Sequence, residues 1–274
     1  MLLNSDQIQS FQSLIWHFYA LHGRSFAWRQ VHDPYHILVS EIMLQQTQTY
    51  RVGPKFEQFI TTFPSYYALA QADLRDVFFV WQGLGYNRRA KALHETAKRI
   101  VNEYAGQLPA CIKQLQTFPG IGHATASSIC AFAFNMPTVF IETNIRAVFI
   151  HTFFALGQTI DDAMLLPLIE QTLVKENARQ WYYALMDYGV YLKKNYKNPA
   201  RRSAHYAKQS RFEGSDRQIR GKIIRYLACH EAVDRLTMIA LLHDDAQRIN
   251  QIIDQLLGEG MLRQDMHERI TIAS

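Results

Sequence analysis

Hydrophobic side chains recur at helical spacing through most of residues 6–190. In the first segment, for example, Ile8, Phe11, Ile15 and Phe18 would lie on one face of a helix. No run of alternating apolar and polar residues, the mark of a half-buried strand, interrupts this pattern. The sequence therefore predicts an all-α region of about ten short helices. Breaks at glycine, proline and asparagine separate them: Asp33–Pro34, Phe63–Pro64, Gly83–Gly85, Leu108–Pro109, Pro119–Gly122 and Asn135–Pro137.

The chain after Gln218 has a different pattern. Helical periodicity returns in three short segments, 219–229, 236–243 and 246–257. A turn at Gly258–Gly260 and an alternating segment, 261–272, then predict a hairpin. Three small helices followed by a hairpin are typical of a winged-helix-like module. Such modules bind DNA or contact proteins, and the fold alone does not decide between the two.

Positive charge is concentrated between the two helical regions, where only Glu213 and Asp216 oppose a run of lysines and arginines. Aromatic residues are interleaved with this run, a mixture that suits a nucleic-acid surface. The segment is predicted to be a linker or an arm that contacts phosphate, or else a solvated helix face. Its basic residues are Lys193, Lys194, Lys197, Arg201, Arg202, Lys208, Arg211, Arg217, Arg220, Lys222 and Arg225.

Composition narrows the class of protein. Of the 274 residues, 48% are hydrophobic and 19% are charged, as in globular rather than disordered proteins. The net charge of +5 favours polyanionic partners, although many other proteins share this balance. The amphipathic first helix does not resemble a signal peptide, and no stretch reaches the ~18–20 apolar residues of a membrane span. We therefore expect a cytoplasmic, monomeric protein with no membrane contact.

The sequence contains Cys111, Cys130 and Cys229. They are too far apart for a metal knuckle and too few for a disulfide framework. All three are therefore predicted to be buried thiols.

The sharpest local signal lies in residues 115–126, where a helix ends in Pro119-Gly120-Ile121-Gly122 and another helix begins at once. The first backbone N–H groups of the second helix would be left without helical partners, and with the helix dipole they suit a phosphate. An ordinary helical corner would give the same pattern. The candidate DNA contacts here are Gly120, Gly122, His123, Ala124 and Thr125.

This hairpin resembles that of the endonuclease III and MutY superfamily. Residues 40–49, Ser-Glu-Ile-Met-Leu-Gln-Gln-Thr-Gln-Thr, are similar to the MutY-type adenine glycosylase signature. Further similar stretches follow in order from about residue 8 to 190. They are His22-Gly23-Arg24, Trp28-Arg29, Trp81 to Tyr86, Asn144 to Val148 and Met186 to Gly189.

The resemblance implies the helix-hairpin-helix DNA glycosylase fold, and the pattern after Gln218 adds a small C-terminal winged-helix-like module, so we expect a mainly α protein. Together the two observations predict four parts. Residues 1–29 and 136–192 form one helical domain, and residues 30–135 form a helical-barrel domain that carries the hairpin. Residues 193–217 form a basic arm or linker, and residues 218–274 form the winged-helix-like domain.

The resemblance also assigns catalytic roles. Glu41 matches the glutamate that protonates the extruded base and assists the attacking water. Its apolar neighbours, Ile42 to Leu44, would raise the pKa of its carboxyl group, as a general acid requires. Glu142 stands where the family has an aspartate that stabilises positive charge on the sugar, and its side chain is one methylene longer. Asn144 is assigned a role in organising the site.

Other positions imply how the DNA is held. Gln45 and Tyr86 match residues that wedge into the duplex beside the extruded nucleotide, and Gln46 is placed with them as a DNA contact. Core packing is the alternative for the tyrosine. Ala124 stands where bifunctional members carry a Schiff-base lysine. The chain is therefore expected to release the base by water attack and to leave the strand unbroken.

Two features usual in the family are missing from the sequence. After Gly189 most of the family carries four cysteines that ligate a [4Fe-4S] cluster. This chain has no cysteine between Gly189 and Cys229, so no iron–sulfur cluster is expected. The basic stretch, with Lys193, Lys194, Arg201 and Arg202, is expected to contact DNA instead. The tail is also too short for the NUDIX-like domain that recognises 8-oxoguanine.

The resemblance also implies a bound cation. A monovalent cation, Na⁺ or K⁺, is expected at the hairpin on the backbone carbonyls of Gln116, Phe118 and Ile121.

Three functions are compatible with these observations. The first is a monofunctional glycosylase of base excision repair that hydrolyses the N-glycosidic bond of a mispaired adenine in double-stranded DNA. The second keeps the fold and the mechanism but acts on uracil, mismatched thymine or another lesion. The third is a non-catalytic DNA-binding protein, which would gain nothing from two acids beside phosphates.

Overall fold

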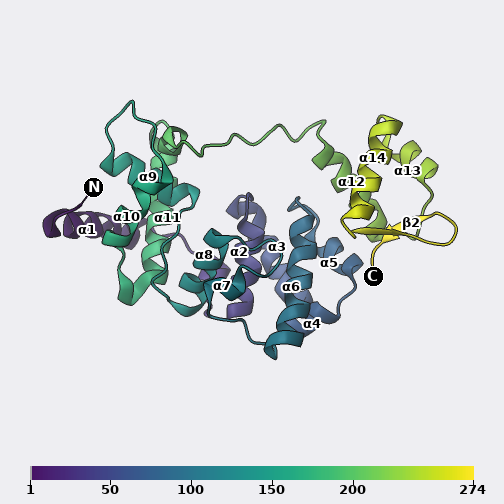
Figure 1. The fold of residues 1–274 in the computed structure, drawn as a ribbon, viewed down its shortest axis with the longest axis horizontal. Helices are drawn as coiled ribbons and strands as arrows, with labels where there is room; N and C mark the ends of the chain where they lie inside the picture. Colours follow the sequence, from purple (N-terminus) through teal and green to yellow (C-terminus); the bar gives the residue numbers. More distant parts are fainter. Residues whose placement is uncertain (1) are drawn as a thin grey trace. The chain divides into compact units, whose positions relative to one another are not determined.

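The computed structural model describes residues 2–274 (Figure 1). Helices account for almost all of the regular structure, and the predicted all-α region is confirmed. Its helices are α1 Ser5–His22, α2 Pro34–Leu44, α3 Thr49–Thr62, α4 Tyr66–Gln71, α5 Leu74–Trp81, α6 Arg88–Tyr104, α7 Ile112–Leu115, α8 His123–Phe134, α9 Thr143–Phe153, α10 Asp162–Thr172 and α11 Ala178–Asn195. Short 3₁₀ helices are η1 Ala27–Arg29, η2 Lys175–Asn177 and η3 Pro199–Arg202.

The helix ends follow local chemistry. Asn4 caps α1 through a capping box with Gln7, and Asp161 caps α10 by accepting from the backbone of Ala163. At the end of α8, Asn135 adopts a left-handed conformation with φ 53°, which breaks the helix where the sequence predicted a break.

The chain divides into two compact units. The first unit comprises residues 1–41, 110–117 and 121–208, and the second comprises residues 42–109, 118–120 and 209–274. Both units are discontinuous in sequence, whereas the predicted helical-barrel domain is one continuous range, and most of the hairpin belongs to the first unit. The reason is that Phe132 of α8 stacks on Tyr183 of α11, with ring centroids 4.6 Å apart. The division into four functional parts stays a prediction.

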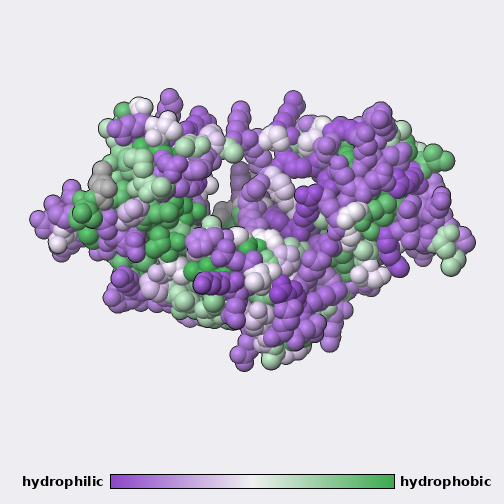
Figure 2. All heavy atoms as spheres, in the orientation of Figure 1, coloured by the Kyte–Doolittle hydropathy of each residue, from purple (hydrophilic) through white to green (hydrophobic). Residues whose placement is uncertain are grey.

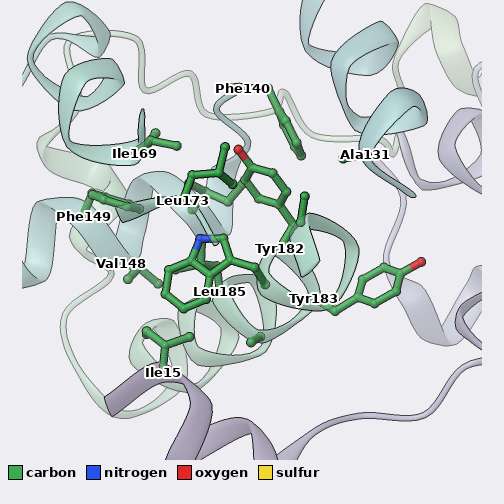
Figure 3. Close-up of a cluster of buried hydrophobic side chains, with 14 of the residues drawn as sticks. Ile15, Ala131, Phe140, Val148, Phe149, Ile169, Leu173, Tyr182, Tyr183 and Leu185 are labelled. Atoms are coloured by element: carbon green, nitrogen blue, oxygen red, sulfur yellow. The ribbon is translucent and has the colours of Figure 1, made fainter. Parts of the chain in front are cut away.

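The core of the first unit forms around α11. Tyr182 and Leu185 lie among Phe140, Val148 and Phe149 in a buried cluster, whereas the Tyr183 ring points away from these three residues (Figure 3). The Tyr182 hydroxyl donates a 2.5 Å hydrogen bond to the backbone carbonyl of Thr138, so this buried polar group is paired. The cluster fixes α11 against α8 and α9, which carry the side chains of the candidate site.

Helices α9 and α11 approach each other closely at Gly189. A Cβ atom on this residue would lie 2.3 Å from the backbone oxygen of Asn144. Only glycine fits here, because a backbone atom cannot move aside as a flexible side chain can.

We expect Gly189→Ala to lower the free energy of unfolding by ~1–3 kcal/mol, because the added methyl forces the two helices apart. Urea denaturation would measure it. Gly221→Ala is the matched control: it lies inside a helix with open space around it and should be neutral or stabilising. Equal effects of the two substitutions would contradict the close-packing argument.

The C-terminal part of the second unit has the predicted winged-helix-like arrangement. It consists of α12 Asp216–Cys229, α13 Arg235–Leu242, α14 Ala246–Gly258, β1 Leu262–Gln264 and β2 Ile270–Ile272. The two strands pair antiparallel, with Leu262 opposite Ile272. Arg75 of α5 ties this module to the rest of the second unit, donating to the backbone of His230 and to Thr271.

The prediction for the cysteines is wrong for two of the three residues. Cys130 is buried, and burial raises the pKa of its thiol to about 11. Cys229 is exposed and Cys111 is partly exposed, because they lie at the end of α12 and just before α7 rather than on a core face. Among residues 2–274, no helix is long and apolar enough to cross a membrane.

Candidate active site

Glu41 lies on α2 in the first unit, where it meets α8. The Ser128 hydroxyl donates a 2.5 Å hydrogen bond to Glu41 Oε2. Burial raises the pKa of Glu41 to about 7, with a further increase from the charge of Glu142. The Ser128 hydrogen bond and the charge of Arg29 oppose that rise. A carboxyl group with a pKa near neutrality suits a general acid, and the catalytic role of Glu41 stays a prediction.

Glu142 is the N-cap of α9. Its Oε1 accepts from the backbone N–H groups of Asn144 and Ile145 at 2.8 and 2.9 Å, and its Oε2 accepts from Asn144 Nδ2 at 3.1 Å. The carboxylate therefore turns back onto the first turn of its own helix. The sequence analysis missed this capping role, which the position of Glu142 directly before a helix could have indicated. Its predicted role beside the sugar stays a prediction.

Asn144 connects this cap to the helix packing. Its side-chain nitrogen holds Glu142, and its backbone lies against Gly189. Its side-chain oxygen Oδ1 is buried and has no hydrogen-bond partner among the described residues. The expected organising role of Asn144 stays a prediction, and its Oδ1 is an acceptor left inside the site.

A buried ion-pair network lies beside the acids. The Asp187 carboxylate, only 1% exposed, accepts two hydrogen bonds from the Arg29 guanidinium, both at 2.9 Å. Arg24 donates to it through its backbone N–H and through Nε. Arg29 also stacks over the ring of Tyr183 at 4.4 Å. Their motifs resemble those of the family, but nothing in the sequence indicated their role. In the structure they fix the cation whose charge acts on Glu41.

In the second unit, Tyr86 is the centre of another cluster. Its backbone is left-handed, with φ 48°, and its hydroxyl accepts hydrogen bonds from Arg217 and Gln209. The guanidinium groups of Arg217 and Arg89 lie 5.3 and 5.5 Å from the centroid of its ring. The ring is therefore held by cations rather than packed in a hydrophobic core.

Arg89 organises the backbone around this tyrosine. Its guanidinium donates to the carbonyls of Ile42, Met43 and Gln45 at the end of α2, and to those of Leu84 and Gly85. Burial lowers the pKa of Arg89 to about 10. Thus one buried side chain holds the main chain of Gln45 and of the two residues that precede Tyr86. The sequence analysis missed it.

Gln45 and the hairpin glycine Gly120 also meet in the second unit. Gln45 Nε2 donates a 3.1 Å hydrogen bond to the Gly120 carbonyl. Gly120 has φ 74°, and a Cβ atom there would lie 3.2 Å from the Cβ of Ala92. A pocket of about 250 Å³ opens beside them, lined by Ile42, Gln45, Arg88, Arg89, Ala92 and Gly120.

Comparisons with known proteins decide the family. Residues 39–167 match the HhH-GPD superfamily of base excision DNA repair proteins. The adenine DNA glycosylase of Mycolicibacterium smegmatis is 31% identical, in an alignment that covers 97% of this chain and 96% of that protein. The chain belongs to the adenine DNA glycosylase family. The enzyme of the same name from Mycobacterium tuberculosis is also 31% identical, over 91% of this chain and 89% of that protein.

Solved structures agree on the fold. A thermostable thymine-DNA glycosylase has a TM-score of 0.59 and 24% identity, covering 66% of this chain and 85% of its own. A trapped endonuclease III–DNA covalent intermediate has a TM-score of 0.57 and 17% identity, covering 69% of this chain and 88% of its own. These likenesses confirm the helix-hairpin-helix glycosylase fold predicted from the motifs.

In this member of the family, the basic segment begins in the last turn of α11 and continues through η3, while residues 206–211 have no regular structure. Lys193 is half-buried, and burial lowers the pKa of its ammonium group, with the charge of Glu142 acting in the opposite direction. Arg202, a predicted phosphate contact, instead donates to the carbonyls of Phe154 and Ala155. Lys194 and Arg201 are exposed, and their predicted contacts with DNA stay predictions.

The hairpin presents the start of α8 to solvent. Gly122 is the N-cap residue, and no side chain among the described residues caps the helix there. His123 and Ala124 are exposed, Thr125 is partly exposed, and Gln46 has a left-handed backbone with φ 53°. Among residues 2–274, no three histidine, cysteine, aspartate or glutamate side chains are placed to hold a metal ion.

Proposed function

We propose that the protein is a monofunctional DNA glycosylase of base excision repair that hydrolyses the N-glycosidic bond of a mispaired adenine in double-stranded DNA. The observation that carries this proposal is the placement of Glu41, with a raised pKa, beside Ser128 and within the electrostatic influence of Glu142. The adenine DNA glycosylases that are 31% identical over most of the chain support the choice of substrate. A monomeric state and a cytoplasmic location are part of the proposal.

The chemistry assigns different tasks to the two acids. Protonated Glu41 donates its proton to a ring nitrogen of the extruded adenine, so that the base leaves as a neutral molecule. The Glu142 carboxylate offsets the positive charge that develops on the sugar. Glu41, now ionised, accepts a proton from the attacking water. Ala124 offers no amine to the sugar, so the product is an abasic site in an unbroken strand.

The hairpin would hold the DNA backbone. Exposed N–H groups at the start of α8, near Gly122 and His123, suit a phosphate. Lys194 and Arg201 supply exposed positive charge elsewhere in the chain. The carbonyls of Gln116, Phe118 and Ile121 are hard oxygen donors of the kind that Na⁺ and K⁺ accept, and a cation there is part of the proposal.

Single-turnover base release from a panel of duplexes tests the substrate. The panel carries adenine opposite 8-oxoguanine, adenine opposite guanine, uracil opposite guanine, thymine opposite guanine, and hypoxanthine. Release of adenine alone supports the proposal. Release of uracil or thymine would assign another specificity to the same mechanism, and no release from any duplex would favour a DNA-binding protein without activity.

The rate of base release is expected to depend on pH through Glu41. A general acid must be protonated, so the rate should be highest below pH 7 and fall as the pH rises through the Glu41 pKa of about 7. Ser128→Ala removes a hydrogen bond that favours the ionised form, so it should shift this fall to higher pH. Single-turnover rates between about pH 5.5 and 9 would measure the shift. Ser127→Ala, at the neighbouring buried serine, is the control, and equal profiles for the two variants would contradict the role of Ser128.

Arg217 is expected to position Tyr86 during base extrusion. Arg217→Ala removes a hydrogen bond to the hydroxyl and a cation–π contact, and should slow base release by about 2- to 30-fold. In a Tyr86→Ala background the same change should have little further effect. Arg211→Ala, which removes an exposed charge from the same segment, is the control. Fully additive effects of the Arg217 and Tyr86 substitutions would argue against the contact.

A further inference from the structure

A pocket of about 560 Å³ lies in the C-terminal module, between α12 and α13. Its volume falls within the range of about 300–1,000 Å³ found for ligand pockets. The apolar lining comes from Tyr226, Met238, Leu241 and Leu242 together with the exposed thiol of Cys229. Nothing in the proposed glycosylase reaction uses this pocket.

Helix α13 exposes several apolar side chains. Of its residues only Met238 is buried, while Leu236 is 79% exposed and Leu241 is 45% exposed. Hydrophobic spheres appear at the surface of the C-terminal module among hydrophilic ones (Figure 2). An eight-residue helix with leucines turned to solvent beside an apolar pocket is typical of a surface that another molecule covers.

The rim of this pocket is basic. Lys222 and Arg225 project from α12, are exposed, and form no ion pair among the described residues. By contrast, Arg220 on the same helix pairs with Glu259. His230 and His243 complete the polar rim, and His230 stacks on Tyr226 with ring centroids 4.1 Å apart. The uncompensated cations favour a partner that carries carboxylates or phosphates.

Two observations favour a protein partner over DNA. Helix-turn-helix modules usually read DNA through the helix that corresponds to α14. Here the cation of α14 is already engaged, because Arg248 pairs with Asp216 and Asp244, and Asp254 on the same helix adds negative charge. The free cations instead border a concave apolar pocket, which accepts a side chain better than it accepts a phosphate backbone.

We propose that the pocket between α12 and α13 binds an acidic segment of a partner protein, with an apolar side chain inserted against Met238 and Leu241 and carboxylates paired with Lys222 and Arg225. The inference goes beyond base excision, since it assigns the C-terminal module to protein contact. The carboxylates select the partner, and the apolar anchor supplies the buried contact area.

The test uses the full chain and a panel of fluorescein-labelled octapeptides. Each peptide carries one central anchor, Leu, Met, Phe or Trp, flanked by aspartates. Fluorescence anisotropy should detect binding of at least one peptide, and replacing its aspartates by lysines should abolish it. Arg225→Glu should weaken binding by roughly tenfold. The matched control Arg263→Glu, at an exposed arginine of β1, should leave binding unchanged.

A second pair of variants tests the apolar part. Leu241→Ser, in the pocket, should weaken binding, whereas Leu236→Ser, on the same helix but outside the pocket lining, should not. Base release should be unchanged in both variants, so that failure of this proposal is distinguishable from failure of the glycosylase proposal. Absence of binding by every peptide at about 1 mM would overturn it. If an undamaged duplex displaced the peptide, and if binding of that duplex required Arg225 and Leu241, the pocket would be assigned to DNA and the proposal would be overturned.

Discussion

Replacing Glu41 by glutamine is expected to lower the rate of base release by ~10²–10⁴-fold, the range that a positioned general acid contributes. The amide keeps the size of the side chain and can still hydrogen-bond to Ser128, but it has no proton to give to the leaving base. Single-turnover kinetics on a duplex with adenine opposite guanine would measure the loss at the chemical step.

The same variant should bind DNA as tightly as the parent protein, because Glu41 makes no expected contact with phosphate. Glu170→Gln is the matched control, since Glu170 is an exposed glutamate of the first unit, and it should leave both rate and affinity unchanged. A Glu41→Gln protein that still releases the base at the parent rate would refute the assignment of the acid.

Asp187→Asn is expected to be the most destabilising of the substitutions considered. Asp187 is buried and compensates Arg29 and Arg24, so its removal leaves guanidinium charge in the interior without a counter-ion. Removing one partner of a buried ion pair typically costs about 3–5 kcal/mol of unfolding free energy. Urea denaturation followed by circular dichroism would measure the change.

Asp254→Asn provides the control. Asp254 also pairs with an arginine, Arg235, but its side chain is 64% exposed, and such surface pairs contribute about 0–1 kcal/mol. If both substitutions cost the same, the buried network would have no special importance. Retention of stability by Asp187→Asn would show that solvent reaches Arg29.

The helical character and the C-terminal module could be predicted because they depend on local periodicity. Residues 219–229, 236–243 and 246–257 were expected to be helical, and α12 to α14 match them within a few residues. Hydrophobic spacing carries this information directly. The breaks between helices were also predictable from local sequence, because proline and asparagine restrict or alter the conformation of their own backbone.

The candidate site was only partly predictable. Glu41 could be identified because its apolar neighbours and its motif lie beside it in sequence. Arg89 could not be identified from the sequence, because the fold brings its partners at residues 42–45 close to it. The composition of the chain does not show which arginines bind backbone carbonyl groups. Long-range hydrogen bonds of this kind can be identified only from the three-dimensional structure.

The basic stretch shows a second limit. From composition, Arg201 and Arg202 are both predicted to contact phosphate. In the structure, Arg202 is held by backbone carbonyls and Arg201 is exposed. A run of cations indicates a need for negative partners but does not distinguish phosphate from the free carbonyls of a neighbouring loop. The degree of burial separates the two cases.

The capping position of Glu142 links two equilibria that are usually considered apart. Its carboxylate stabilises the first turn of α9, and the same charge helps Glu41 to keep its proton. Fraying of that turn would release Glu142 and thereby weaken the hold of Glu41 on the proton. By reciprocity, protonation of Glu41 favours the folded turn, so the proton that Glu41 donates to the base also acts as a ligand that orders the helix start.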